Sequence, residues 1–179
     1  MMEQEDIKLP IGTDYPILEK IRLARLLFEA YGEELQGDRN VSSLIASYRS
    51  AIRETWEQMD KSGVIEHCTD CAVRDGGSCC GKGIEDRFDT ALILINLLMG
   101  SRIPDSREDD AGCWFLGREG CLIVAREVIC VNYICKKLYR KISWPDMQVL
   151  QAKIMQETDA AFMLDATVKS WLAGRLDPG

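Results

Sequence analysis

Apolar residues recur every three or four positions along two stretches near the start of the chain, residues 14–36 and 41–60. This period puts them on one face of an α-helix, so a helix is predicted over each stretch, the first capped by Thr13 or Asp14. Residues 37–40 break the pattern, and because this connection is short we expect the two helices to pack as an antiparallel hairpin. The expected inward positions are Ile17, Ile21, Ala24, Phe28, Tyr31, Leu35, Val41, Leu44, Ile45, Tyr48, Ile52, Trp56 and Met59.

Two more apolar patterns predict a central helix and a long C-terminal helix. Residues 85–99 are apolar on most of the helical circumference and end before Gly100, which is typical of a buried helix with a glycine stop. Residues 143–174 begin with Ser143 as a cap and Asp146 three positions later. We expect this helix to pack over the first hairpin. Its expected inward positions are Met147, Leu150, Ile154, Phe162, Met163, Leu164, Val168, Trp171 and Leu172.

A short β-hairpin is predicted between these helices. Residues 113–116 and 121–124 are apolar runs around a turn bounded by glycines, which would bring Cys113 and Cys121 to matching ends of paired strands. The preceding loop, residues 101–112, is expected to be exposed and polar. The predicted fold is therefore mainly α: a helical bundle with an irregular cysteine-rich metal-binding insert and one short β-hairpin.

The length of 179 residues and a hydrophobic content of 46% favour a single domain with a core of its own. We expect one unit over residues 1–179. It would consist of an N-terminal helical hairpin (1–61), a cysteine-cluster region (62–136) and the C-terminal helix (143–174).

Charge and hydropathy exclude some partners. A net charge of −7 argues against binding nucleic acid, since non-specific affinity for phosphate comes mainly from Lys and Arg. The longest apolar run, residues 91–99, is much shorter than the roughly 20 residues of a membrane-spanning helix. Residues 1–8 are acidic and lack the basic and apolar segments of an export signal, so we expect a cytoplasmic protein with reduced thiols.

Eight cysteines lie within 68 residues and none lies outside them. Their spacing is C-x2-C-x7-C-C, then, after 32 residues, C-x7-C-x8-C-x4-C. In a cytosolic protein such a cluster is more typical of metal binding than of cross-linking. We therefore predict as metal ligands Cys68, Cys71, Cys79, Cys80, Cys113, Cys121, Cys130 and Cys135.

The first four cysteines leave several arrangements open. Cys68 and Cys71 are expected on one tight turn, from which both sulfurs reach a single metal. Adjacent residues in extended chain point to opposite sides, so Cys79 and Cys80 would serve two neighbouring centres, or one would ligate while the other packs or reacts. A vicinal disulfide is a third arrangement. The glycines around this pair, in residues 76–83, would let the backbone curl close to an inorganic centre.

The last four cysteines also allow more than one arrangement. Cys113 and Cys121 would be two ligands of one centre or a disulfide across the hairpin. Cys130 and Cys135 lie five residues apart, about 140° around a helix, so they cannot share one helical face. We expect Cys130 to precede a helix that carries Cys135 in its first turns, or one of the two to be a small buried hydrophobe.

The cysteine count is compatible with zinc or with an iron–sulfur centre. Each zinc ion held by cysteine alone needs four thiolates, and an iron–sulfur cluster also takes four. The single histidine, His67, would be a ligand, a hydrogen-bond donor to sulfur or an exposed loop residue. The vicinal pair, the glycines and the apolar helix nearby suit an iron–sulfur cluster somewhat better than zinc.

Residues 67–136 resemble the bacterial YkgJ-type cysteine-cluster family of zinc- or iron-chelating domain proteins. The resemblance lies in the ordered set of eight cysteines, in Cys113-Trp-Phe-Leu-Gly, and in Gly120-Cys121-Leu-Ile with the following Arg126. The flagellin lysine methylases are similar in their cysteine segment. The chain departs from the family at Glu127, where the family usually has Pro, and at Val131, where it usually has Arg. The resemblance implies a chelating function.

Three classes of function follow. The first is a metal- or cluster-binding module with a structural or redox role, in which Arg126 would hydrogen-bond to sulfur or form a surface ion pair. The second is an enzyme or enzyme subunit related to the lysine methylases, although the chain has no nucleotide-binding loop and no catalytic triad. The third is a helical protein-interaction module stabilised by metal, which a large exposed apolar patch on the C-terminal helix would favour.

Overall fold

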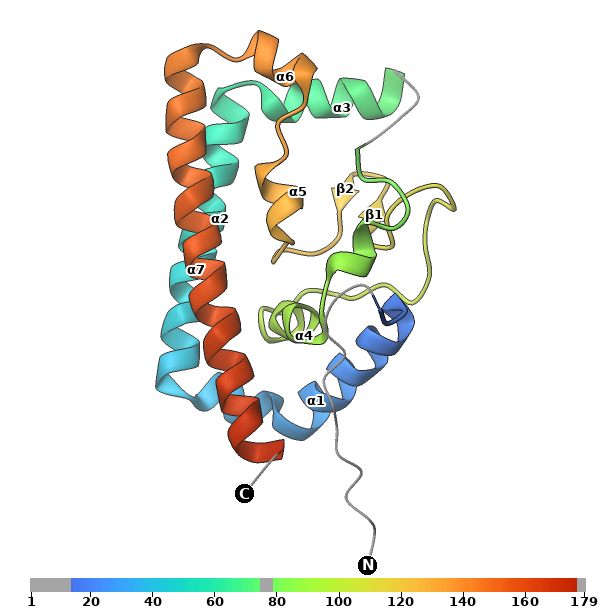
Figure 1. The fold of residues 1–179 in the computed structure, drawn as a ribbon, viewed down its shortest axis with the longest axis vertical. Helices are drawn as coiled ribbons and strands as arrows, with labels where there is room; N and C mark the ends of the chain where they lie inside the picture. The colour runs from blue at the N-terminus through green and yellow to red at the C-terminus, as the bar shows by residue number, and fades with distance from the viewer. Residues whose placement is uncertain (1–13, 75–78, 177–179) are drawn as a thin grey trace, which may run out of the picture.

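The computed structural model describes residues 14–74 and 79–176. It confirms a mainly α fold with one short hairpin (Figure 1). The elements in chain order are α1 (Ile17–Gly37), α2 (Arg39–Lys61), α3 (Val64–Arg74), a 3-10 turn (Ile84–Arg87), α4 (Thr90–Leu98), β1 (Leu116–Gly117), β2 (Gly120–Cys121), α5 (Val128–Asn132), α6 (Lys136–Lys141) and α7 (Trp144–Leu176). Among the described helices, none is both long and apolar enough to cross a membrane.

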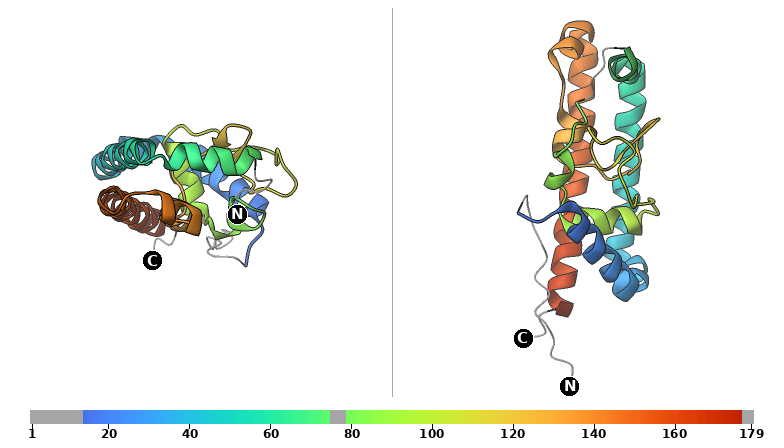
Figure 2. Two further views of the ribbon diagram at one scale, coloured as in Figure 1. Left: turned by 90° about the horizontal axis from the view of Figure 1, so that it is seen from above. Right: turned by 90° about the vertical axis from the view of Figure 1, so that its right-hand side faces the viewer.

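Helices α2 and α7 form the frame of the molecule. They run antiparallel and side by side over most of their length, as both views show (Figures 1 and 2). The hydroxyl of Thr55 links them through the carbonyl of Lys153 at 3.2 Å, and the Lys153 ammonium pairs with Glu54. The Ser143 cap is confirmed, because its hydroxyl accepts from the Asp146 amide at 3.2 Å.

The inward face predicted for α7 is wrong at two positions. Phe162 and Met163 are 69% and 54% exposed. The buried residues of α7 instead follow the line from Leu150 through Leu164 to Leu172, which faces α2 and α4. On a helix this long, an apolar residue fits the 3.6 period on more than one face, so periodicity alone did not exclude these two.

Helix α1 does not pair with α2 in the expected way. A single residue, Asp38, joins them, and its carboxylate caps α2 by accepting from the amides of Asn40 and Val41. Helix α1 then packs mainly on α4, whereas α2 packs mainly on α7. The predicted cap of α1 is also wrong at Asp14, since the helix begins at Ile17 with Pro16 before it and no side-chain cap. Thr13 lies outside the described residues.

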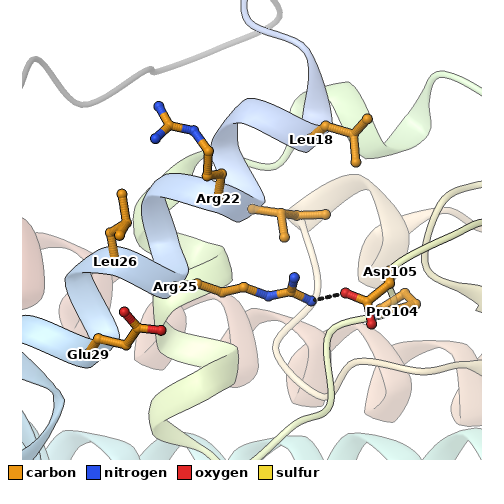
Figure 3. A pocket seen from close by; sticks show the side chains of 8 residues that line it. Leu18, Arg22, Arg25, Leu26, Glu29, Pro104 and Asp105 are labelled. Atoms are coloured by element: carbon orange, nitrogen blue, oxygen red, sulfur yellow. Dashed lines mark hydrogen bonds and ion pairs between the residues drawn. The ribbon is translucent and has the colours of Figure 1, made fainter.

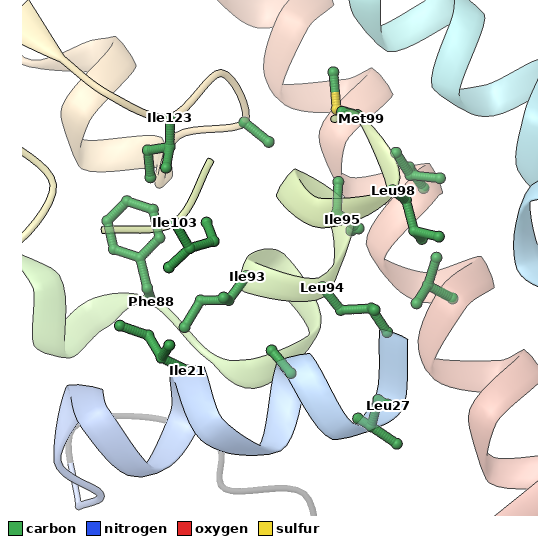
Figure 4. Close-up of a cluster of buried hydrophobic side chains, with 14 of the residues drawn as sticks. Ile21, Leu27, Phe88, Ile93, Leu94, Ile95, Leu98, Met99, Ile103 and Ile123 are labelled. Atoms are coloured by element: carbon green, nitrogen blue, oxygen red, sulfur yellow. The ribbon is translucent and has the colours of Figure 1, made fainter. Parts of the chain in front are cut away.

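Helix α4 occupies the centre of the main hydrophobic core, between α1 and α7 (Figure 4). The predicted helix over 85–99 is interrupted at its start, because Phe88 is extended and Asp89 caps a new helix by accepting from the Leu92 amide at 2.8 Å. The Phe88 ring packs on Phe115 with 4.8 Å between ring centres. The glycine stop is confirmed, with Gly100 at φ 77°.

A second hydrophobic cluster lies where α3 and α6 meet the upper ends of α2 and α7 in Figure 1. Its buried members are Met59, Val64, Val131, Leu138, Ile142, Met147, Leu150 and Ile154. The cysteine-bearing segments lie beside the frame, some packed against this second cluster and others against the main core.

Candidate metal centre

Cys68 and Cys71 lie one turn apart on α3, so the tight turn expected for them is wrong. Val64 at the start of the helix is buried in the second hydrophobic cluster, which also holds Met59 of α2, and α3 packs on α2. Residues 68–71 continue the helix that Val64 begins. The C-x2-C spacing is thus an i, i+3 pair that presents both thiols from one helical face. His67, on the same helix, is half-buried rather than an exposed loop residue.

Cys135 caps α6, beside α3. Its sulfur accepts from the Leu138 amide at 3.5 Å. Cys130 lies inside the separate short helix α5, which Glu127 caps by accepting from the Ile129 amide at 2.9 Å. The prediction that these two cysteines do not share a regular helix is confirmed, and Cys130 precedes α6 as expected. The prediction differs from the structure in two details, since Cys130 lies in a short helix of its own and Cys135 caps α6 instead of lying in its first turns.

Cys79 and Cys80 follow residues 75–78, which lie outside the described residues. Part of the glycine-rich stretch falls within residues 75–78. The carbonyl of Cys80 accepts from the Cys113 amide at 2.9 Å, and Gly81 forms a bridge with Gly112. These backbone contacts join the two cysteine groups directly. The hairpin does not place Cys113 opposite Cys121 as predicted, because Cys121 pairs with Leu116 and Cys113 precedes the paired strands.

An ion pair between Glu85 and Arg107 stabilises the junction where the backbone at Cys80 and Gly81 meets the backbone at Gly112 and Cys113. Both side chains are largely buried, so the loop 101–112 is not simply solvated as expected. Arg107 also donates to the Gly112 carbonyl at 2.5 Å, and Glu85 accepts from the Gly83 amide at 2.9 Å. Burial alone would raise the pKa of Glu85, but the hydrogen bonds from Arg107 and the backbone outweigh it and hold this pKa below its ordinary value.

Asn96 anchors the segment between the hairpin and α5. Its side-chain oxygen accepts from the amides of Val124 and Ala125 at 3.0 and 2.9 Å, and its nitrogen donates to the Ala125 carbonyl at 2.7 Å. Asn96 is fully buried on α4. The sequence signal for it was a lone polar residue within an apolar helix.

Arg126, which follows this anchored segment, lies over Trp56 of α2, with 4.7 Å between the guanidinium carbon and the ring centre. Burial raises the pKa of the Cys121 thiol and raises that of Cys130 to about 11. The positive charge of Arg126 opposes the shift at both thiols. Arg126 is therefore close enough to favour anionic sulfur at two of the predicted ligands.

All eight cysteines are described, and none of them forms a disulfide in the structure. Several of these thiols raise one another's pKa, because two thiolates close together repel each other. After burial, which is the largest cause, Cys135, Cys71 and Cys80 raise the pKa of Cys68. A hydrogen bond with Cys80 is the first cause of the raised pKa of Cys79, and Cys68 also contributes.

The downstream thiols form a second neighbourhood. Burial raises the pKa of Cys113 to about 12, and Cys121 and Cys130 contribute to the rise. Cys80 contributes to the raised pKa of both Cys121 and Cys130. Thiols from six segments of chain are thus gathered beside the frame, with Cys80 between the two neighbourhoods.

The thiols are neighbours, but they do not converge on one point. In the described ranges, no group of three or more His, Cys, Asp or Glu side chains is arranged so that it could hold a metal ion. Metal binding would require side-chain rotation and a closer approach of the segments.

Two hollows lie on the described surface, one of them beside the cysteine-bearing helix α5. One, of about 280 Å³, lies between α1 and Pro104, and the Arg25–Asp105 ion pair of 2.7 Å lines it (Figure 3). The other, of about 340 Å³, lies beside α5 and is lined by Arg87 and Tyr133. No cysteine lines either hollow.

In comparisons with models of protein families, with curated proteins and with solved structures, none matches this chain.

Proposed function

We propose that this protein binds zinc or an iron–sulfur centre through two sets of four cysteines. The first set is Cys68, Cys71, Cys79 and Cys135. The second is Cys80, Cys113, Cys121 and Cys130. The observation that carries the proposal is the gathering of eight cysteines, none of them in a disulfide, on segments that pack against two hydrophobic clusters and are joined by the Cys80–Cys113 backbone hydrogen bond.

The packing of the chain supports the division into two sets. Cys135 packs against the second hydrophobic cluster, as does α3, which carries Cys68 and Cys71. Cys80, Cys113 and Cys130 belong to or pack against the main core. Cys80 therefore lies with the main core, and we place Cys79 in the first set because the charge of Cys68 contributes to its raised pKa.

Backbone amides near sulfur also suit a bound metal. The amide of Leu138 donates to Cys135, and hydrogen bonds from the amides of Phe115 and Ile123 lower the pKa of Cys113 and Cys121 against the larger effect of burial. Such hydrogen bonds stabilise thiolate, the form that binds metal, and tune the potential of iron–sulfur clusters. The resemblance of residues 67–136 to the YkgJ-type family agrees with this proposal.

A bound zinc ion would stabilise the fold, whereas an iron–sulfur cluster would also supply one-electron redox chemistry. The protein residues would provide thiolates, a half-buried cation at Arg126 and an apolar wall formed by α4. Both sets reach the surface: Cys68 and Cys79 of the first set and Cys121 of the second are exposed, whereas Cys113 of the second is buried.

Anaerobic purification, followed by metal and sulfide analysis and a visible spectrum of one sample, tests the proposal. Stoichiometric iron and sulfide, with a visible band that bleaches on reduction, would identify a cluster. A colourless protein with one or two zinc ions would identify a structural site. A protein without either metal, which takes up neither zinc nor iron and sulfide on reconstitution, would contradict the proposal.

A further inference from the structure

The face of α7 opposite its buried line is exposed and mostly apolar. Met155, Phe162 and Met163 are 60%, 69% and 54% exposed. In α7, which the structure describes throughout, the exposed positions from 148 to 174 include a single charged side chain, that of Asp159. Seen from above, α7 lies at the edge of the molecule, beside α2 (Figure 2). We call this exposed side the outer face of α7.

Helix α2 provides a comparison, because it is the other long helix of the frame. Its exposed positions are mostly polar or charged and include Ser42, Ser47, Arg53 and Glu57. A polar side toward water is the ordinary pattern of a surface helix, whereas α7 is apolar on both sides. A contiguous exposed apolar face of this kind marks a surface that binds a partner.

The outer face repeats with the period of a coiled-coil seam. Its central positions are spaced alternately by four and three residues, and this period keeps them facing a neighbouring helix. These positions, the outer seam, are Met155, Asp159, Phe162, Ala166, Lys169 and Ala173. The pattern therefore suits a second helix packed along this side of α7.

The apolar residues of the outer seam are complementary to themselves when two copies run antiparallel. The large side chains lie N-terminal to the level of Leu164, and the small ones lie C-terminal to it. Phe162 and Ala166 are equally far from this level, and so are Met155 and Ala173. A two-fold axis at Leu164 therefore sets each large side chain opposite a small one, which allows the two helices to approach closely.

Charges match in the same alignment, because it places Asp159 of each copy opposite Lys169 of the other. The Lys169 ammonium pairs with Asp89 at 2.6 Å and with Asp165 at 2.8 Å. A lysine has three N–H donors, so the third can serve the carboxylate of a second copy. Moving one copy by seven residues along the other would instead bring the two Asp159 carboxylates close together, and repulsion between like charges disfavours that alignment.

We propose that the outer seam of α7 binds a second copy of this chain, antiparallel and related by a two-fold axis. In this dimer Phe162 packs on Ala166 of the other copy. Asp159 pairs with Lys169 in the same way. The inference does not rest on the proposed function, because α7 carries no cysteine.

The length of the seam limits the strength of the dimer. The aligned segments, residues 152–176 of each copy, are about 37 Å long and would bury roughly 900 Å² in total. This area is at the lower end for specific interfaces, so we expect a reversible dimer with a dissociation constant in the micromolar range.

Sedimentation equilibrium of the full-length protein, in a reducing buffer that prevents cross-linking through exposed thiols, tests the proposal. From micromolar to near-millimolar protein we expect a monomer–dimer equilibrium. Phe162→Glu should raise the dissociation constant about tenfold or more, because it places a carboxylate inside an apolar contact. Leu26→Glu makes the same kind of change at an exposed apolar residue of α1 and should leave the constant unchanged. Both residues are exposed, so both variants should fold, which thermal unfolding checks.

An exchange of two residues tests the alignment itself. Phe162→Ala should weaken the dimer. The double variant Phe162→Ala/Ala166→Phe should restore most of the affinity, because the large and small side chains change places across the axis. Asp159→Lys should also weaken the dimer, since two ammonium groups would then face each other.

Several results would contradict the inference. A protein that stays monomeric over the whole concentration range, or a dimer that Phe162→Glu leaves intact, would overturn it. Equal weakening by Phe162→Glu and Leu26→Glu would overturn it as well. Loss of the dimer in Phe162→Glu without recovery in the double variant would overturn the antiparallel alignment.

Discussion

The backbone amide of Cys113 donates a hydrogen bond to the carbonyl of Cys80 at 2.9 Å. Cys80 follows Cys79 directly, yet this contact ties it to the downstream cysteines. The Gly81–Gly112 bridge extends the connection by one residue on each side. Two cysteine groups that are separate in the sequence are therefore one structural unit at Cys80.

Serine substitutions should distinguish the two proposed cysteine sets. Cys68→Ser should lower the metal bound by the first set, and Cys80→Ser the metal bound by the second, because a hydroxyl is a much poorer ligand than a thiolate. Each should also lower the melting temperature of the metal-loaded protein. Metal analysis and thermal unfolding on matched preparations measure both effects.

Thr69→Ala is a suitable control for Cys68→Ser. Thr69 lies next to Cys68 on α3, is exposed, and its hydroxyl donates to the Ile65 carbonyl of the same helix at 2.9 Å. We expect unchanged metal content in this variant. If both cysteine variants also kept full metal content and stability, the ligand assignment would be wrong.

Removal of Arg107 should destabilise the junction at Cys80. Arg107→Ala would leave the carboxylate of Glu85 buried without its cation, and breaking a buried pair in this way costs about 3–5 kcal/mol. Arg53→Ala, at an exposed pair with Glu57, should cost less than about 1 kcal/mol. Urea unfolding of the three proteins at neutral pH gives the comparison, and similar losses in both variants would contradict the role of the clamp.

The same ion pair predicts a sensitivity to acid. Because the pKa of Glu85 is lower in the folded than in the unfolded chain, its contribution to stability is complete above the unfolded value of about 4.3. It is lost as the pH falls through the folded value. The difference in melting temperature between the unaltered chain and Glu85→Gln should therefore shrink below about pH 4. A difference that stays constant with pH would show that ionisation of Glu85 is not involved.

Metal-free protein should lose stability in alkali. The thiols of Cys113 and Cys130 have folded pKa values of about 12 and about 11, above the unfolded value of about 8.5. Their contribution is complete below about pH 8.5 and declines as the pH rises toward the folded values. Melting of reduced, chelator-treated protein between about pH 7 and 10.5 should show this decline, and metal-loaded protein should show much less of it. Equal declines in both forms would argue against these thiols as ligands.

Asn96→Leu should disturb the segment that leads to Arg126. The variant would leave the amides of Val124 and Ala125 and the carbonyl of Ala125 buried without partners, at a cost of roughly 3 kcal/mol in total. Metal affinity of the second set should fall as well, because this segment lies between Cys121 and Cys130. Ser101→Ala, which removes only a weaker contact with Asn96 at 3.3 Å, should change neither property. Unfolding and metal titration of both variants test the prediction.

The helices were predictable because their signals are local. Apolar periodicity identified α2 and α7, and the caps and stops at Ser143 and Gly100 were confirmed. The partner of each helix was not predictable in this way. The connection at Asp38 suggested an α1–α2 hairpin, but the long apolar faces of α2 and α7 pair across the whole chain instead.

Cysteine spacing identified the candidate site but not its geometry. C-x2-C is compatible with a tight turn or with one turn of a helix, and the burial of Val64 in the second hydrophobic cluster favours the helix. The Glu85–Arg107 clamp and the contacts of Asn96 join residues far apart in the sequence. The partners of these residues are set by tertiary packing, and a local sequence pattern does not predict them.

The pairing of α2 with α7 also has a consequence for biosynthesis. Every cysteine precedes α7 along the chain, so all eight thiols leave the ribosome before the frame can close. Domains fold as they are made at about 5–20 residues per second, and α7 adds 33 residues after the last cysteine segment. The nascent chain therefore passes through a period of seconds in which the thiols are accessible to a metal donor or to an oxidant, before the last helix docks.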